Sequence, residues 1–198
     1  MVLFLLTILL PSFSYSQSEL PPTDFPVLVT SCGQSTGPVL LKAIFKRMKL
    51  NPSPETFVIV DQATAEDLTI AKGTGSPYKT VIIVMGASLK GMGAAGISID
   101  DEIDRSSKLI AEARRQKITI IGAHIEGMKR RAQGAAVGDN TDELSIDAIG
   151  PNSDLLIVIE EGNADERFTI ISKDKGIPLI EAEKLLDLVD EFKKIFKM

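Results

Sequence analysis

The chain has 198 residues, with 22 Lys and Arg, 27 Asp and Glu, and a net charge of −5. A chain of this length buries enough surface to fold without a metal or a disulfide framework. One cysteine and one histidine exclude Cys-rich and His-rich metal centres. The acidic balance and the absence of Trp argue against a nucleic-acid-binding protein. We therefore expect no metal and no nucleic-acid partner.

The first 16 residues, MVLFLLTILLPSFSYS, form a separate segment that has no charged side chain. Ser14 and Ser16 place small residues at −3 and −1 of a cleavage before Gln17. The apolar run of about ten residues spans about 15 Å as a helix, which is too short for a hydrocarbon core of roughly 30 Å. We predict a signal peptide over residues 1–16, export to the periplasm or the cell exterior, and no stable membrane anchor after cleavage. The alternative is a buried N-terminal strand.

Residues 17–26 contain three prolines and are predicted to form an extended, poorly packed lead-in. From residue 27 the chain alternates β-branched runs with helical patterns. Strands are predicted at 27–30, 56–60, 80–85, 118–121, 155–159 and 177–180. A helix is predicted to start at Ser35 or Thr36 with Pro38 in its first turn, and others at 98–116 and 182–197. Shorter helices are predicted at 65–71, 141–149 and 165–172.

The predicted strands are apolar almost throughout, which is typical of a parallel sheet covered on both faces. We therefore predict that residues 27–198 form a single α/β domain, a three-layer, doubly wound sheet of about six mainly parallel strands, Rossmann-like or flavodoxin-like. Ligands of such sheets bind beyond the carboxyl ends of the strands, where the strand order reverses. The loops after the strands are therefore the places to look for function.

The loop after the first predicted strand contains Gly33, Gln34 and Ser35 and leads into a helix. Free backbone amides and the positive end of the helix dipole make such a loop an anion cradle. The alternative is that Ser35 and Thr36 only cap the helix and Gly33 only turns the chain. Cys32 is a candidate nucleophile, although a small residue that fills the strand end is the more common role for such a cysteine.

The segment 86–96 after the third predicted strand contains four glycines with Ser88 and Lys90 among them. Its spacing fits neither a phosphate-binding P-loop nor a short-chain dehydrogenase loop, and we expect no cofactor. We predict a flexible glycine loop in which Ser88, Lys90 and Gly91 enclose a polar or anionic group. The alternative is a surface lid.

The loops after the fourth and fifth predicted strands carry the remaining candidates. His124 is either a general base or a satisfied structural residue. Arg130 and Arg131 follow Lys129 and suit carboxylate or phosphate recognition, unless the three form a solvated face. Acidic and amide groups at the next strand end can perform acid–base chemistry, hold a cation or cap a helix; they are Glu160, Glu161, Asn163 and Asp165.

Three stretches together resemble a domain-of-unknown-function family of exported bacterial proteins: PVLVTSCGQS at 26–35, KTVIIVMGASLKGMGAAGISID at 79–100, and RRAQG, SDLLIVIEEGNADERF and IPL within 130–179. The resemblance implies a secreted Rossmann-like domain and transfers no catalytic role. Cys32 lies outside the shared pattern. The motif positions it marks are Gly33, Gln34, Ser35, Gly86, Lys90, Gly91, Gly93, Arg130, Arg131, Glu161, Gly162 and Asn163.

These observations lead to an extracytoplasmic domain that binds a small anionic or polyhydroxylated molecule in a cleft between the strand-end loops. The first alternative is a cofactor-free hydrolase or transferase that uses His124 with Glu160, Glu161 or Asp142, and Ser35 or Cys32 as nucleophile. The second is an interaction module that binds another envelope protein. The predicted ligand-binding residues are Gly33, Gln34, Ser35, Ser88, Lys90, Gly91, His124, Arg130, Arg131, Glu161 and Asn163.

Overall fold

The computed structural model describes residues 19–73, 78–132 and 140–198, so the predicted signal peptide lies outside the described residues. Six strands form one sheet in the order β2-β1-β3-β4-β5-β6, and every neighbouring pair is parallel. The strand order reverses between β1 and β3, as in flavodoxin-like sheets. The strands are β1 (Val27–Ser31), β2 (Phe57–Ile59), β3 (Thr80–Val84), β4 (Thr119–His124), β5 (Leu155–Ile159) and β6 (Leu179–Ala182).

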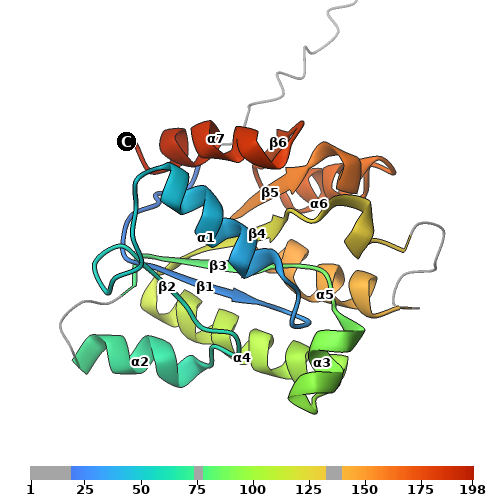
Figure 1. The fold of residues 1–198 in the computed structure, drawn as a ribbon, viewed down its shortest axis with the longest axis horizontal. Coiled ribbons are helices and arrows are strands. Elements are labelled where there is room, and N and C mark those ends of the chain that lie inside the picture. The colour runs from blue at the N-terminus through green and yellow to red at the C-terminus, as the bar shows by residue number, and fades with distance from the viewer. Residues whose placement is uncertain (1–18, 74–77, 133–139) are drawn as a thin grey trace, which may run out of the picture.

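Helices cover both faces of the sheet (Figure 1). Helices α1 (Gly37–Arg47) and α7 (Leu188–Ile195) pack on one face, and α2 (Ala65–Gly73), α4 (Ile99–Gln116), α5 (Thr141–Ile149) and α6 (Arg167–Lys175) on the other. The short helix α3 (Leu89–Ala95) follows β3. The predicted three-layer α/β fold is therefore confirmed. None of the described helices is both long and apolar enough to cross a membrane.

Both faces of the central strands are buried, which explains their continuous apolar sequence. Val29 and Ile82 pack in the layer under α1 and α7, whereas Leu28 and Val81 pack under α4. Because successive side chains of a strand point to opposite faces, each central strand needs apolar residues at nearly every position.

Two element boundaries near the C-terminus differ from the prediction. Strand β6 begins at Leu179, because Ile177 N–H donates to Ser172 O (2.9 Å) and still belongs to the turn that ends α6. The last helix begins later than predicted, because Ala182 is the last residue of β6. A short 3₁₀-helix, Leu185–Asp187, precedes α7, and Lys184 N–H donates to an oxygen of the Asp187 side chain (2.9 Å).

The described part of the lead-in, residues 19–26, has no helix or strand but is better packed than predicted. Thr23 Oγ1 donates to Ile195 O (2.6 Å). The ring of Phe25 stacks on that of Phe196 with their centroids 4.6 Å apart. These contacts fix the segment against α7.

The segment 86–96 is not the flexible loop predicted from its glycines, because most of it forms α3. Ser88 Oγ accepts a hydrogen bond from Gly91 N–H (3.0 Å) and caps the helix. Gly96 ends it in the left-handed conformation, with φ of +68°. Gly91 is required by packing, since a Cβ there would lie 2.3 Å from Gln34 O, whereas a Cβ at Gly93 would meet nothing within 4 Å.

Two substitutions within α3 test this packing. We expect Gly91→Ala to lower the free energy of unfolding by about 1–3 kcal/mol, because the new methyl overlaps a backbone oxygen. Gly93→Ala should instead raise it by about 0.5–1 kcal/mol through helix propensity. Denaturant unfolding of both variants measures the difference, and equal effects would show that α3 does not pack on the loop after β1.

Candidate functional site

The loops after β1 and β3 meet directly at the point where the strand order reverses. Ser88 N–H donates to Gly33 O (2.7 Å). A Cβ at Gly33, which has φ of +107°, would lie 2.6 Å from Ala87 Cα. Glycine is required there both for the positive φ and for the close approach. The two loops therefore fill the space between them.

The amides of these loops already have anionic partners within the chain. Gly33 N–H donates to Glu102 Oε2 (2.7 Å), and Ala87 N–H donates to Asp142 Oδ1 (2.8 Å). Arg105 Nε in turn donates to the Glu102 carboxylate (2.9 Å). Burial raises the pKa of Asp142, and the hydrogen bond from Ala87 opposes that effect. Side-chain carboxylates thus take the place that we predicted for an anionic ligand.

The other candidates in this region lie around the two loops. Gln34 Nε2 donates to Asp61 O (3.1 Å), and Ser35 Oγ accepts from Gly37 N–H (3.3 Å). Lys90 is exposed on α3. Ser35 therefore acts at the start of α1, as the structural alternative predicts.

Cys32 is completely buried at the end of β1. Burial raises the pKa of its thiol. Since the thiolate is the nucleophile, a buried thiol with a raised pKa is inert at neutral pH.

His124 is buried at the end of β4, and its ring centroid lies 4.9 Å from that of Phe168. Its Nε2 lies 3.1 Å from Arg130 O. Because a carbonyl only accepts, Nε2 carries the proton and Nδ1 is the unprotonated nitrogen. Nδ1 has no hydrogen-bond partner among the described residues, and a Cβ at Gly162 would lie 2.6 Å from it.

Burial lowers the pKa of His124 to about 4. The carbonyl of Arg130 and the carboxylates of Glu143 and Glu126 oppose this shift, and the charge of Arg131 adds to it. The imidazole is therefore neutral at physiological pH. Within the part of the chain that the structure describes, no hydrogen bond joins it to Ser35 or Cys32.

Arg130 links the loops after β3 and β4. Its Nη1 donates to Ala87 O (3.0 Å) and its Nε to Glu126 Oε2 (3.2 Å). A Cβ at Gly86 would lie 2.6 Å from Arg130 Cβ, so glycine there makes room for this side chain. The guanidinium is held by the protein on two sides.

Arg131 points into a buried ion-pair network, and only 1% of its side chain is exposed. Its Nε donates to Glu143 Oε1 (2.8 Å) and its Nη2 to Asp165 Oδ2 (2.6 Å). Arg167 Nε lies 2.9 Å from the second oxygen of Glu143. The guanidinium carbon lies 5.5 Å from the centre of the Phe168 ring. This network joins the segment after β4 to α5 and α6.

The candidates after β5 have different environments. Asn163 Oδ1 accepts from Phe168 N–H (2.8 Å), while its Nδ2 donates to Glu181 Oε1 (2.7 Å). It therefore holds the first turn of α6 against β6. Glu160 and Glu161 are both exposed, and only Glu161 lines the pocket described next.

A pocket of about 390 Å³ lies at the carboxyl edge of β4, β5 and β6, beside the start of α1. It brings together the ends of elements that are far apart in sequence. Of the predicted site residues, it includes Glu161 but not the others. Its lining residues are Thr36, Leu40, Ile125, Glu126, Gly127, Lys129, Ile159, Glu161, Glu183, Lys184 and Leu185.

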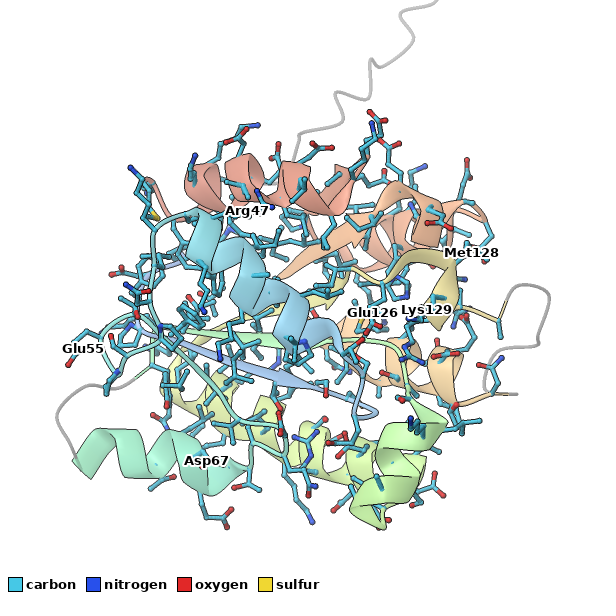
Figure 2. All side chains as sticks on the ribbon, in the orientation of Figure 1. Arg47, Glu55, Asp67, Glu126, Met128 and Lys129 are labelled. Atoms are coloured by element: carbon cyan, nitrogen blue, oxygen red, sulfur yellow. The ribbon has the colours of Figure 1, made fainter. Side chains whose placement is uncertain are left out.

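Glu126 is the polar group that distinguishes this pocket. Only 3% of its side chain is exposed. Its Oε2 accepts from Thr36 Oγ1 (2.8 Å) and from Arg130, but Oε1 has no hydrogen-bond partner among the described residues. Figure 2 labels Glu126 and Lys129 close together on the segment after β4. A buried carboxylate oxygen without a donor costs free energy, which makes it a candidate contact for a ligand.

Sequence reasoning missed Thr36 and Glu126 as pocket residues. The sequence pattern predicts Thr36 only as a helix cap, but its side chain does not cap α1 and donates to Glu126 instead. The available signal was the position of Glu126, two residues after the end of β4 on the ligand-binding edge of a parallel sheet.

A larger cavity of about 590 Å³ lies between α6, the start of β6 and α7. Glu19 and Leu20, the first described residues, form part of its wall. None of the predicted site residues lines this cavity.

The buried imidazole predicts a pH dependence of stability. His124 has a pKa of about 4 in the folded protein and 6.5 as its ordinary value. Between these values the unfolded chain binds a proton that the folded chain does not, so the free energy of unfolding should fall as the pH falls from 6.5 to 4. The loss attributable to this group is about 3 kcal/mol.

Denaturant unfolding at several pH values, compared between the unsubstituted protein and His124→Asn, measures this contribution. The variant should lose less stability across the window, because it retains the acidic groups and lacks the imidazole. Parallel pH curves for the two proteins would contradict the assignment.

Comparisons with known proteins identify a family for this chain but do not identify an activity. Three solved structures match the chain at low similarity. An acetyl xylan esterase, AlAXEase, has 10% identity and a TM-score of 0.39 over 84% of this chain and 81% of its own. AlinE4, an SGNH-hydrolase family esterase, has 13% identity and a TM-score of 0.32 over 90% and 85%. The YdjI aldolase from Escherichia coli K12 has 14% identity and a TM-score of 0.20 over 86% and 90%.

No curated protein sequence matches the chain. A family model, described as "Domain of unknown function (DUF6305)", matches residues 24–196. This range includes every described strand and helix. The resemblance to a domain-of-unknown-function family is therefore confirmed, and the chain belongs to the DUF6305 family.

Proposed function

We propose that this domain binds a small polar molecule, outside the cytoplasm, in the pocket at the carboxyl edge of β4, β5 and β6. The observation that carries the proposal is the buried Glu126 carboxylate in the pocket wall, whose Oε1 has no donor among the described residues. A ligand N–H or O–H at this oxygen would remove the cost of burying it without a donor. That cost is about 1–3 kcal/mol for a neutral group and larger for a charged group. The volume, about 390 Å³, is in the range of small-molecule sites.

The charges of the pocket favour a ligand that both donates and accepts hydrogen bonds. Glu183 and Lys184 form an ion pair with each other (2.8 Å). The carboxylate of Glu161, the ammonium of Lys129 and one oxygen of Glu126, whose other oxygen is paired with Arg130, are then left for a ligand. A polyhydroxylated molecule meets this requirement, as would any molecule with both kinds of group.

A purely anionic ligand is less well supported. The groups that the sequence analysis assigned to anion recognition already have carboxylate partners within the chain, namely Glu102 for Gly33 N–H and Glu143 with Asp165 for Arg131. The carboxylates of Glu126 and Glu161 only accept hydrogen bonds, and an anion without donors cannot supply them. We therefore propose a small-molecule ligand that carries hydrogen-bond donors.

The hydrolase alternative needs a nucleophile beside a base. His124 Nε2 faces Arg130 O, Ser35 Oγ accepts from Gly37 N–H, and the thiol of Cys32 is buried. No observation on the described residues favours turnover over binding. Binding of an envelope protein instead of a small molecule stays a prediction from the sequence.

Two pairs of matched variants test the pocket. Lys129→Gln and Glu161→Gln change lining residues, whereas Lys90→Gln and Glu160→Gln change exposed residues of the same type outside the pocket. Mass spectrometry of small molecules released from the protein purified from its native host identifies what is bound. We expect a polar molecule in the unsubstituted protein and in both controls, with affinity reduced about tenfold or more in the pocket variants.

Equal recovery of the molecule from all five proteins would place it elsewhere. Recovery of no small molecule, together with no thermal stabilisation by any compound of a metabolite library, would contradict a binding function.

Export is the part of the proposal that rests on residues 1–16. We expect the protein isolated from its native host to begin at or near Gln17, because Ser14 and Ser16 satisfy the cleavage requirement. Intact-mass measurement of the native protein determines this. A soluble cytoplasmic form that retains Met1 would overturn the localisation.

A further inference from the structure

The inference concerns the chemical class of the ligand and rests on the proposed binding function. The apolar part of the pocket is aliphatic: its lining includes Leu40 from α1, Ile125 after β4, Ile159 at the end of β5 and Leu185 after β6. None of the lining residues is aromatic. The wall therefore matches an aliphatic group of the ligand, because burial of apolar surface favours binding.

The polar part of the pocket combines two unlike charges that the protein leaves unpaired. The side chains of Glu161 and Lys129 form no ion pair or hydrogen bond within the described ranges, and Glu126 Oε1 has no donor there either. An ammonium group suits these carboxylates, because it supplies N–H donors to acceptors that have no donor within the described ranges. A carboxylate suits Lys129.

We propose that the pocket binds a zwitterion with an aliphatic side chain, that is, an aliphatic amino acid or a short aliphatic peptide. Its amino group lies at Glu126 and Glu161, its carboxylate at Lys129, and its side chain on Leu40, Ile125, Ile159 and Leu185. A neutral polyol leaves the charges of Glu161 and Lys129 without a partner, and a dicarboxylate offers no donor to Glu161 or to Glu126 Oε1. A zwitterion compensates both signs of charge and also uses the aliphatic wall.

Isothermal titration calorimetry with four probes tests the class. L-leucine and L-leucyl-L-leucine carry both charged groups, N-acetyl-L-leucine lacks the ammonium, and L-leucinamide lacks the carboxylate. We expect at least one of the two zwitterions to bind, and the two blocked leucines to bind at least tenfold more weakly than leucine or the dipeptide.

Variants then identify which charge meets which group. Lys129→Gln should weaken zwitterion binding about tenfold or more and leave any leucinamide binding unchanged, because leucinamide lacks the carboxylate that Lys129 contacts. Glu161→Gln should weaken the zwitterion and leave N-acetyl-leucine unchanged. Lys90→Gln and Glu160→Gln should behave like the unsubstituted protein. Glu126→Gln keeps the shape of the side chain. Its binding is compared with that of the unsubstituted protein only if the two have the same melting temperature.

Glucose and succinate, titrated in parallel, separate failure of the class from failure of the proposed function. Binding of glucose or succinate that Lys129→Gln or Glu161→Gln weakens, with no binding of leucine or leucyl-leucine, overturns the zwitterion and keeps the pocket. Zwitterion binding that neither pocket variant changes overturns the assignment to this site. If no probe binds and no small molecule is recovered from the native protein, the inference and the proposed function both fail.

Discussion

The need to pair charged groups that leave water governs the carboxyl edge of this sheet. Arg130 and Arg131 are adjacent in sequence but serve different sides: Arg130 holds Ala87 O and Glu126, and Arg131 holds Glu143 and Asp165. An unpaired charge in a buried position costs several kcal/mol, so each loop must reach a partner. These pairings fix the loops after β3 and β4 to each other and to α5 and α6. The shape of the pocket follows from where the loops are fixed.

The layer structure could be predicted from the sequence because it depends on local patterns. Apolar runs of five or six residues, such as Leu155–Ile159, become central strands when both faces of the sheet are covered. Boundaries were less predictable where a single hydrogen bond decides them, as at Ile177. The glycines of α3 misled the prediction because Gly91 serves close packing on Gln34 O and not a flexible loop. A glycine in a sequence does not reveal which of these roles it has.

The sequence predicts where the candidate site lies in the fold, but it does not predict which groups of that region already have hydrogen-bond partners. The strand-end loops do converge, yet the acceptor of Gly33 N–H is Glu102, 69 residues further along the chain. No local pattern distinguishes an amide that awaits a ligand from one that has a distant carboxylate. The same holds for Arg131 and for Asn163, whose partners come from α5, α6 and β6. Residue type and strand-end position identify the edge of the sheet, and only three-dimensional contacts identify which of its groups are unpaired.

Glu126 connects the pocket to the stability of the fold. One of its oxygens accepts from Thr36 at the start of α1 and from Arg130, so the carboxylate already joins two loops before any ligand binds. A donor at the other oxygen would complete its hydrogen bonds and strengthen the same junction. Binding to the folded state alone stabilises it in proportion to the logarithm of ligand concentration. Because Glu126 joins the start of α1 to the segment after β4, a ligand donor at its Oε1 would stabilise the folded state at this junction.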